Sequence, residues 1–366
     1  MMRVVLAPDS FKGTITAADA AAALAEGWAS IDPSAEFVHR PMADGGEGTM
    51  AAFAAAVPDA ERMPVVVDGP AGVPVSAHWL LLPPTADAPG GIAVIDLAST
   101  SGIELLDALR PWDADTTGFG QAIVAALEHG VSRLVLGIGS SASNDGGTGM
   151  LTALGARFLD SSGAAVARGA RGLVDIAAVD LSGLRTAPQV RVLTDVTNPL
   201  AGPRGAAAVF GPQKGLAGDE IGHVDAALLR LAGLLGLDPE LPGAGAAGGT
   251  GGALVAWGAT LAPGAAEVAE LIGLADAIAE ADVVITGEGS FDGQSGDGKV
   301  PSYIAGLATA SRATALLAAG RIAADSDTAL FAASASLTTL AGSSDAALAD
   351  PERWLREAGA LLARSV

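Results

Sequence analysis

Hydrophobic and polar positions follow a repeated arrangement along this chain. Apolar runs without alternation, such as residues 3–7, 190–194 and 283–286, predict buried strands of a parallel sheet. Each run leads into a polar loop that contains glycine, proline or asparagine. The first 60 residues repeat the order strand, loop, helix, which predicts a doubly wound α/β fold. In that fold, ligands bind at the carboxyl ends of the strands.

Helices are predicted where apolar side chains recur every three or four residues. These segments are residues 17–28 (with Thr16 as the N-cap), 51–56, 116–128, 224–237, 267–280 and 350–363. Further strands are predicted at residues 36–42, 134–138, 314–318 and 328–332. After residue 60 the pattern changes to short strands split by Pro and Gly, at 63–68, 78–82 and 92–97. This change predicts a more antiparallel or mixed sheet.

Composition narrows the classes of protein that are compatible with this pattern. At 366 residues the chain has room for two domains, and half of its residues are hydrophobic. A net charge of −21 argues against nucleic acid or an anionic membrane as a partner. The lack of cysteine excludes disulfides and thiolate zinc sites, and it fits a reducing cytoplasm. Residues 241–266 are uncharged but contain eight glycines and two prolines, which favours a loop over a membrane span.

The strongest candidate for chemistry is the stretch GSSASNDGGTGM at residues 139–150. It stands between a predicted strand and apolar residues at helical spacing, so backbone N–H groups and a helix dipole would point at an anion. Ser143, Asn144 and Asp145 add a hydroxyl, an amide and a carboxylate. Residues 44–48 and 145–149 share the form DGGxG, so two such loops are expected to flank one ligand or to share a turn geometry.

Lysine use also points to phosphate. The chain has three lysines, Lys12, Lys214 and Lys299, and each is adjacent to a glycine. A compact ammonium beside flexible backbone is a common way to bind a phosphate.

Two familiar nucleotide-binding motifs are discounted. The GxGxxG match at 243–248 does not follow a strand, and the GxxxxGK match at 293–299 is followed by Val and Pro. The four histidines lie outside the glycine-rich loops, so a general base must be a carboxylate.

The remaining polar residues of interest gather in loops, several of them at predicted strand ends. They are Asp9, Ser10, Lys12, Asp44, Glu47, Thr49, Ser143, Asn144, Asp145, Asp195, Asn198, Gln213, Lys214, Glu288, Asp292 and Lys299, and the loop glycines Gly45, Gly46, Gly146 and Gly147 join them. Carboxylates and asparagine suit Mg²⁺, whereas lysines and loop N–H groups suit phosphates. These residues predict a kinase or phosphatase that acts on a small anionic substrate, unless the loops use Gly and Asp only for turns.

The loops together resemble the bacterial glycerate kinases of the type 1 family. The stretches that carry the resemblance are APDSFKG (7–13), PMADGGEGT (41–49), GSSASNDGGTGM (139–150), DVTNPLAGPRGAAAVFGPQKG (195–215), PGAGAAGGTGGAL (242–254) and VITGEGSFDGQSGDGK (284–299). The resemblance implies transfer of the ATP γ-phosphoryl group to D-glycerate. It also implies a flavodoxin-like domain from residues 1–60 and 282–366, an inserted mixed α/β domain at 61–281, and an active site in the cleft between them.

The positions of these residues in the loops and their residue types predict roles for them in this reaction. Asp195, or alternatively Asp9, accepts the proton of the glycerate hydroxyl, and Asp195 and Asp145 are candidate Mg²⁺ ligands. Lys12 and Lys214 neutralise phosphate charge. Asp44, Gly45, Gly46, Glu47, Gln213 and Asn198 join the substrate-binding set.

The side chains of Ser143 and Asn144 and the amides of Gly146 and Gly147 are expected to hold either the glycerate carboxylate or an ATP phosphate. The predicted product is 2-phosphoglycerate, with 3-phosphoglycerate and a non-catalytic sugar-acid-binding regulator as alternatives. The expected partners are D-glycerate and ATP, a homodimer is allowed, and the cytoplasm is the expected location.

The resemblance has one clear departure after the GEG stretch. Ser290 and Phe291 stand where the family usually has arginine and an aliphatic residue. If that arginine meets a phosphate or the substrate carboxylate, another cation must replace it, and the sequence suggests Arg204 or Lys299.

Overall fold

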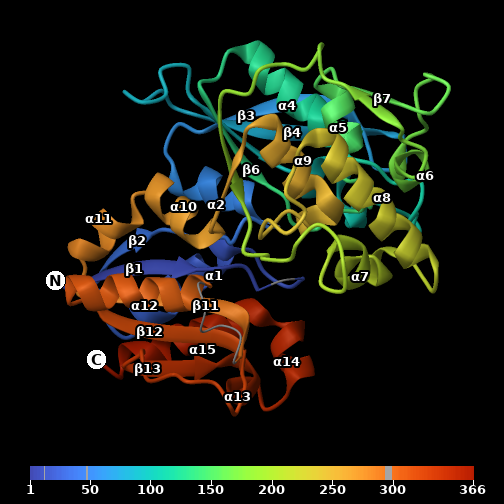
Figure 1. The fold of residues 1–366 in the computed structure, drawn as a ribbon. Helices are drawn as coiled ribbons and strands as arrows, with labels where there is room; N and C mark the ends of the chain where they lie inside the picture. The colour runs from blue at the N-terminus through green and yellow to red at the C-terminus, as the bar shows by residue number, and fades with distance from the viewer. Residues whose placement is uncertain (12, 47, 293–298) are drawn as a thin grey trace. The chain divides into compact units, whose positions relative to one another are not determined.

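The computed structural model describes residues 1–11, 13–46, 48–292 and 299–366, which fold as a mixed α/β protein. They divide into two compact units (Figure 1). Unit 1 consists of Met1–Asp44, Ala51–Pro58 and Pro263–Val366, and unit 2 of Gly45–Met50 and Asp59–Ala262. Unit 1 is therefore built from both ends of the chain.

Unit 1 contains a sheet of five parallel strands in the order β13-β12-β11-β1-β2. Counted along the chain this order is 2-1-3-4-5, which is typical of flavodoxin-like sheets. The strands are β1 (Arg3–Pro8), β2 (Glu36–His39), β11 (Val283–Phe291), β12 (Thr314–Ile322) and β13 (Ala333–Ser336).

Helices cover both faces of this sheet. They are α1 (Ala17–Ala29), α10 (Gly264–Leu271), α11 (Leu274–Ala279), α12 (Val300–Ser311), α13 (Leu337–Ala341), α14 (Ser344–Ala349) and α15 (Pro351–Ala363), while α2 (Thr49–Ala56) begins in unit 2 and ends in unit 1. Thr16 caps α1 as predicted, because its Oγ1 accepts a hydrogen bond of 3.1 Å from the Asp19 amide. Glycine lets α1 and α15 approach closely, since a Cβ on Gly27 would lie 2.0 Å from the Arg356 carbonyl oxygen.

Unit 2 contains a six-stranded mixed sheet in the order β10-β9-β6-β5-β4-β3. The strands from β10 to β5 pair in parallel, whereas β4 pairs antiparallel with both β5 and β3, which confirms the predicted mixed sheet. These strands are β3 (Glu61–Asp68), β4 (Pro74–Leu82), β5 (Ile92–Asp96), β6 (Arg133–Gly137), β9 (Gln189–Leu193) and β10 (Thr260–Ala262). Two further strands, β7 (Arg157–Leu159) and β8 (Ala178–Asp180), form a small antiparallel pair.

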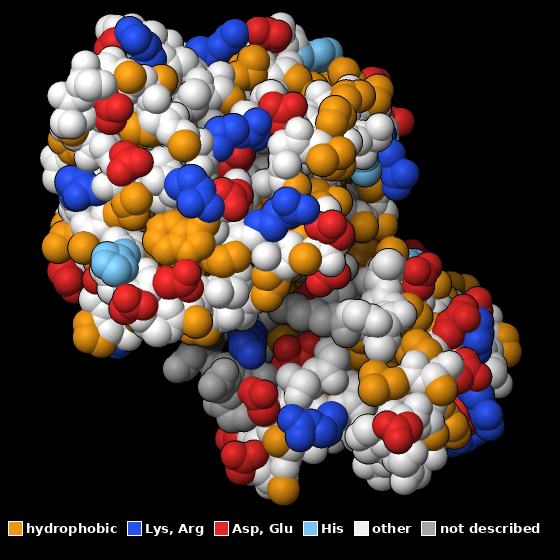
Figure 2. All heavy atoms as spheres, turned by 90° about the vertical axis from the view of Figure 1, so that its right-hand side faces the viewer, with side chains coloured by type: hydrophobic (Ala, Val, Ile, Leu, Met, Phe, Trp, Pro, Cys, Tyr) orange, Lys and Arg blue, Asp and Glu red, His pale blue; other side chains and the backbone are white. Residues whose placement is uncertain are grey.

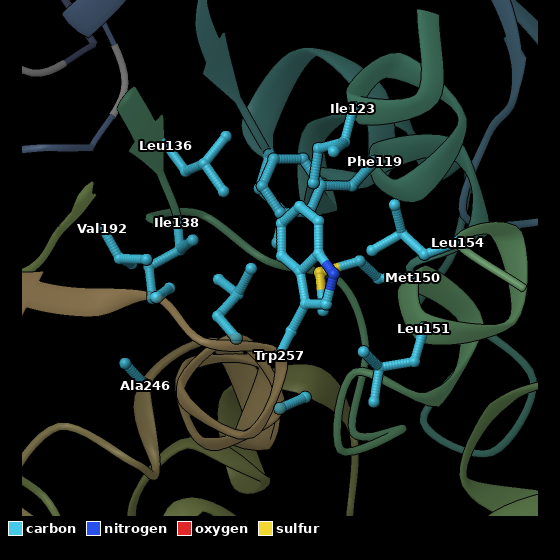
Figure 3. Packing of buried hydrophobic residues seen from close by; sticks show 14 of the residues in the cluster. Phe119, Ile123, Leu136, Ile138, Met150, Leu151, Leu154, Val192, Ala246 and Trp257 are labelled. Atoms are coloured by element: carbon cyan, nitrogen blue, oxygen red, sulfur yellow. The ribbon is translucent and has the colours of Figure 1, made fainter. Parts of the chain in front are cut away.

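Aromatic and aliphatic side chains from the sheet and several helices form the core of unit 2. The helices are α3 (Ala98–Ser101), α4 (Thr117–His129), α5 (Thr148–Ala153), α6 (Gly169–Leu173), α7 (Ala206–Phe210), α8 (Glu220–Leu235) and α9 (Thr250–Trp257), with 3₁₀ turns at Ile103–Leu105, Pro212–Lys214 and Ala246–Gly249. Figure 3 shows Trp257 reaching into the centre of this cluster, with Phe119 and Met150 beside it. The indole Nε1 of Trp257 donates to the Arg185 carbonyl at 2.8 Å, so its buried polar atom is satisfied.

Three predicted segments differ from the structure. The single helix predicted at 267–280 is broken into α10 and α11 at Gly273, whose φ is +65°. The strand predicted at 328–332 is absent, and pairing with β12 begins instead at Ala333. The uncharged stretch 241–266, predicted as a loop, contains helix α9 and strand β10. Across the described ranges, no helix is both long and apolar enough to cross a membrane.

The division of the chain also differs from the predicted one. Residues 263–281 were expected in the inserted part, but they group with unit 1, because α10 and α11 pack against α12. Figure 2 shows Lys, Arg, Asp and Glu side chains of both signs scattered among hydrophobic and other surface on the face in view.

Candidate active site

The carboxyl ends of the strands in unit 1 surround a cavity of about 530 Å³. Parallel sheets of this strand order bind ligands where the order reverses, which is here between β1 and β11. Six of the predicted site residues line this cavity: Asp9, Ser10, Asp44, Glu288, Asp292 and Lys299. The structure therefore brings together residues from both ends of the sequence.

Asp9 is held at the end of β1 by its own backbone. Its amide donates to the Gly287 carbonyl of β11 at 2.8 Å, and the Ser10 amide donates to Asp9 Oδ1 at 2.6 Å. The side chain is largely buried but lines the cavity. A carboxylate fixed in this way is suited to orient a ligand group or a cation.

Sequence reasoning missed a second cation of this cavity, Arg321. It lies near the end of β12, directly opposite Ser290 in the β11–β12 register, and its Nη2 donates to Ser290 Oγ at 3.3 Å. A guanidinium from the neighbouring strand thus stands beside the position where the resemblance predicts arginine. No motif surrounds Arg321, and the only signal in the sequence is a cation shortly after the apolar run at 314–318.

In unit 2, the stretch 139–150 is organised around the buried carboxylate of Asp145. Its Oδ2 accepts from the Thr116 amide (3.0 Å), the Thr116 hydroxyl (2.8 Å) and the Gly149 amide (3.1 Å). Its Oδ1 accepts from the Ser143 hydroxyl (3.1 Å) and the Gly147 amide (3.0 Å). Burial raises the pKa of Asp145, with a contribution from the nearby charge of Asp115, while these hydrogen bonds oppose the shift.

These bonds change the interpretation of the predicted anion site. The amides of Gly146 and Gly147 donate inside the protein, to Gly248 and Asp145 respectively, at 3.0 Å. The Asp145 carboxylate takes the place that an anionic ligand was expected to fill, and both of its oxygens are occupied. Asn144 is buried as well and donates to the Pro111 carbonyl at 3.2 Å.

Lys214 is buried against the same loop. Its Nζ donates to the Ser143 carbonyl at 2.6 Å and to the Ser141 hydroxyl at 3.2 Å. The sequence had instead predicted that this ammonium binds a phosphate. Burial lowers the pKa of Lys214 to about 7, while the charge of Asp145 opposes the shift. With only 3% of its surface exposed, Lys214 ties two loops together, whereas the neighbouring Gln213 is exposed.

The glycine tract at 243–249 packs tightly against these loops. A Cβ on Gly248 would lie 2.1 Å from the Ser143 carbonyl oxygen, and one on Gly245 would lie 2.2 Å from the Pro199 carbonyl oxygen. Gly248 also has a φ of +67°, which side chains rarely adopt. The glycines therefore serve close backbone approach, in agreement with the rejection of a dinucleotide motif.

The start of the 139–150 stretch contacts the DGGxG loop at 44–48 through glycine. The Gly139 amide donates to the Gly45 carbonyl at 3.4 Å, and a Cβ on Gly139 would lie 2.6 Å from Gly46 Cα.

Other predicted site residues lie elsewhere in unit 2. Asp195 is exposed just after β9, and Asn198 donates to the Arg204 carbonyl at 2.8 Å. Lys12 and Glu47, predicted to bind phosphate or substrate, lie outside the described residues.

Asp96 is a further carboxylate that sequence reasoning missed. It ends β5 and is 7% exposed, and its Oδ1 accepts from the Ser99 amide at 2.9 Å. Burial raises the pKa of Asp96, and the bonds from Ser99 oppose the shift. Its signal in the sequence is a single carboxylate at the end of the apolar run 92–97.

Comparisons with known proteins agree with the resemblance. Residues 4–366 match the glycerate kinase family. The chain is 40% identical to the glycerate kinase of Bacillus subtilis (strain 168) over 337 residues, which cover 89% of this chain and 87% of that protein. It is 42% identical to the glycerate 2-kinase of Escherichia coli (strain K12) over 318 residues, which cover 84% and 82%. A crystal structure of a candidate glycerate kinase 2 from Salmonella typhimurium LT2 aligns with a TM-score of 0.86 at 38% identity, covering 99% of this chain and 97% of that one.

Proposed function

The chain belongs to the glycerate kinase family and is an ATP-dependent kinase, and from this premise we propose that it converts D-glycerate to 2-phosphoglycerate. The choice of the 2-position is supported by the name of the Escherichia coli relative, a glycerate 2-kinase. The fold agrees with this function, since its flavodoxin-like sheet carries a cavity at the strand ends.

The observation that carries the proposal is the mixed charge of this cavity. Asp9, Asp44 and Glu288 supply carboxylates, and Lys299 and Arg321 supply cations. Phosphoryl transfer depends on positioning and on neutralisation of phosphate charge rather than on covalent chemistry by the protein. Carboxylates and cations around one cavity fit that requirement.

For the proton of the glycerate hydroxyl we propose Asp195 as acceptor, with Asp9 as the alternative. Asp195 is exposed on a loop after β9, and Asp9 is fixed at the end of β1. Asp145 and Lys214 are proposed to position the 139–150 loop rather than to contact phosphate, because their polar atoms bond within unit 2. Lys12 keeps the phosphate role that its residue type and loop position predict.

The cavity is also suited to Mg²⁺. This ion commonly binds one or two carboxylates together with substrate phosphates, and Asp9, Asp44 and Glu288 would supply such oxygens. Within the described part of the chain, no three acidic or histidine side chains form a ready metal cage. When bound with the nucleotide, Mg²⁺ would neutralise charge on the phosphates.

The proposal is tested by ³¹P and ¹H NMR of the product formed from D-glycerate and MgATP, with L-glycerate as the control substrate. We expect ADP and 2-phosphoglycerate with D-glycerate, and little turnover with L-glycerate. A 3-phosphoglycerate spectrum would overturn the regiochemistry alone. Binding of D-glycerate without ADP formation would instead favour a non-catalytic sugar-acid-binding regulator.

Location and assembly remain predictions. A chain without cysteine suits the reducing cytoplasm. A homodimer is checked by light scattering of the purified protein, where the mass of one chain, 35.8 kDa, would refute it.

A further inference from the structure

One wall of the unit 1 cavity is apolar and has no role in the function argued so far. It is formed by the C-terminal segment that follows β13, through Leu337, Ala347, Leu348 and Pro351. Leu337 and Ala347 are buried in the core of unit 1, whereas Leu348 is 60% exposed. The cavity thus combines charged residues at the strand ends with an apolar side. Its volume of about 530 Å³ lies in the range of pockets that hold small ligands and cofactors.

The two cations of the cavity differ from several arginines of the protein. Arg3, Arg168 and Arg356, for example, form ion pairs with carboxylates. In the described part of the chain, no carboxylate lies within ion-pair distance of Arg321 or Lys299, and Arg321 donates to the neutral Ser290 hydroxyl at 3.3 Å. A guanidinium in this state keeps most of its N–H donors for a ligand with acidic oxygens.

A nucleotide has both kinds of surface that this cavity presents. Its base is flat and largely apolar on its faces, and its phosphates are anionic and accept bidentate hydrogen bonds from arginine. Glycerate, by contrast, is small and polar and offers no apolar face for Leu348 and Pro351. The hydroxyl of Thr338, which lines the cavity and donates to the Gly320 carbonyl at 2.9 Å, retains lone pairs for an exocyclic amino group.

We propose that the apolar wall of the unit 1 cavity binds the base of the nucleotide and that Arg321 and Lys299 bind its phosphates. This inference rests on the proposed kinase function and assigns one of its two substrates to unit 1. Arg321 then acts from β12 as the cation that the departure at Ser290 requires, in place of the Arg204 that the sequence also suggested.

The test measures binding of the non-hydrolysable analogue AMP-PNP with Mg²⁺ by calorimetry, together with steady-state kinetics. Two variants probe the two parts of the cavity: Arg321→Gln removes the guanidinium, and Leu348→Glu places a carboxylate on the apolar wall. Both side chains are exposed, so neither change opens the core. The matched controls are Arg364→Gln and Leu361→Glu, which alter exposed residues of unit 1 that do not line the cavity.

We expect each cavity variant to raise the Kd for AMP-PNP and the KM for ATP by about 10-fold or more, with the KM for D-glycerate unchanged. The controls should bind AMP-PNP as the original protein does. If the cavity variants match the controls while the enzyme still phosphorylates D-glycerate, the nucleotide site is overturned and the proposed function stands. If the KM for D-glycerate rises instead of that for ATP, the cavity binds the organic acid and the inference is overturned. If nucleotide binding is lost as expected but no organic acid is phosphorylated, the site stands and the proposed function fails.

Discussion

Replacing Asp145 by asparagine tests whether this carboxylate organises the 139–150 loop. The substitution keeps the size of the side chain and one carbonyl oxygen, which can still accept from the Ser143 hydroxyl and the Gly147 amide. The second oxygen becomes an amide NH₂ that faces the backbone amides of Thr116 and Gly149. Each buried donor that loses its acceptor costs about 1–3 kcal/mol, so two of them should lower the free energy of unfolding by about 2–6 kcal/mol.

The measurement is urea unfolding followed by circular dichroism and tryptophan fluorescence, with Asp113→Asn as the control. Asp113 bonds instead to a cation, Arg171 at 2.8 Å, and this pair is exposed and should contribute less than about 1 kcal/mol. If Asp145→Asn loses no more stability than the control, Asp145 is not the organising group of this loop. Phosphate or glycerate would then remain candidate ligands of the same amides.

Three further predictions concern unit 2. The native pKa of Lys214, about 7, lies below its unfolded value of 10.5, so the unfolded chain binds more protons between these two values. The free energy of unfolding should therefore rise with pH in this range, by up to about 1.4 kcal/mol per pH unit. Lys214→Met should remove this rise in urea titrations at pH 7, 8 and 9, and an equal dependence on pH in the variant and the original protein would contradict the prediction. Gly248→Ala should lower the thermal midpoint by several degrees, because its Cβ would lie 2.1 Å from the Ser143 carbonyl oxygen, whereas Gly222→Ala, with open space around it, should not lower it. Asp195→Asn should reduce kcat by about 100-fold or more with an unchanged circular dichroism spectrum, and a kcat equal to that of the original protein would remove Asp195 from the proton transfer.

Much of the fold could be predicted because its elements have clear local signals. The strand at the N-terminus has an unbroken apolar run, and α1 has both an N-cap threonine and a periodic apolar face. Predictions failed where tertiary pairing decided the outcome. The segment 328–332 contains Leu330 and Phe331, yet Phe331 packs edge-to-face on Phe291 outside any strand. The small, polar segment Ala333–Ser336 pairs with β12 instead.

The candidate site was predictable in its residue types more than in their contacts. A lysine beside glycine in a loop indicates a phosphate ligand, and nothing local shows that Lys214 is buried against Ser143, 71 positions away. Likewise, an aspartate before two glycines is compatible with a metal ligand or with a loop organiser, and only the donors around Asp145 distinguish them. Arg321 was missed because its role depends on the strand beside it.

The central place of β1 in its sheet has a consequence for how this protein is made. β1 pairs on one side with β11, so that the Arg3 amide reaches the Asp282 carboxylate across 279 positions of sequence. During synthesis, all of unit 2 is made before β11, and until then the sheet of unit 1 has β1 and β2 without its other three strands. Such distant pairing slows folding and leaves an apolar strand open to aggregation. A nascent chain that ends at Ala262 therefore contains every segment of unit 2 but only two of the five strands of the unit 1 sheet, which cannot be completed until β11, β12 and β13 have been made.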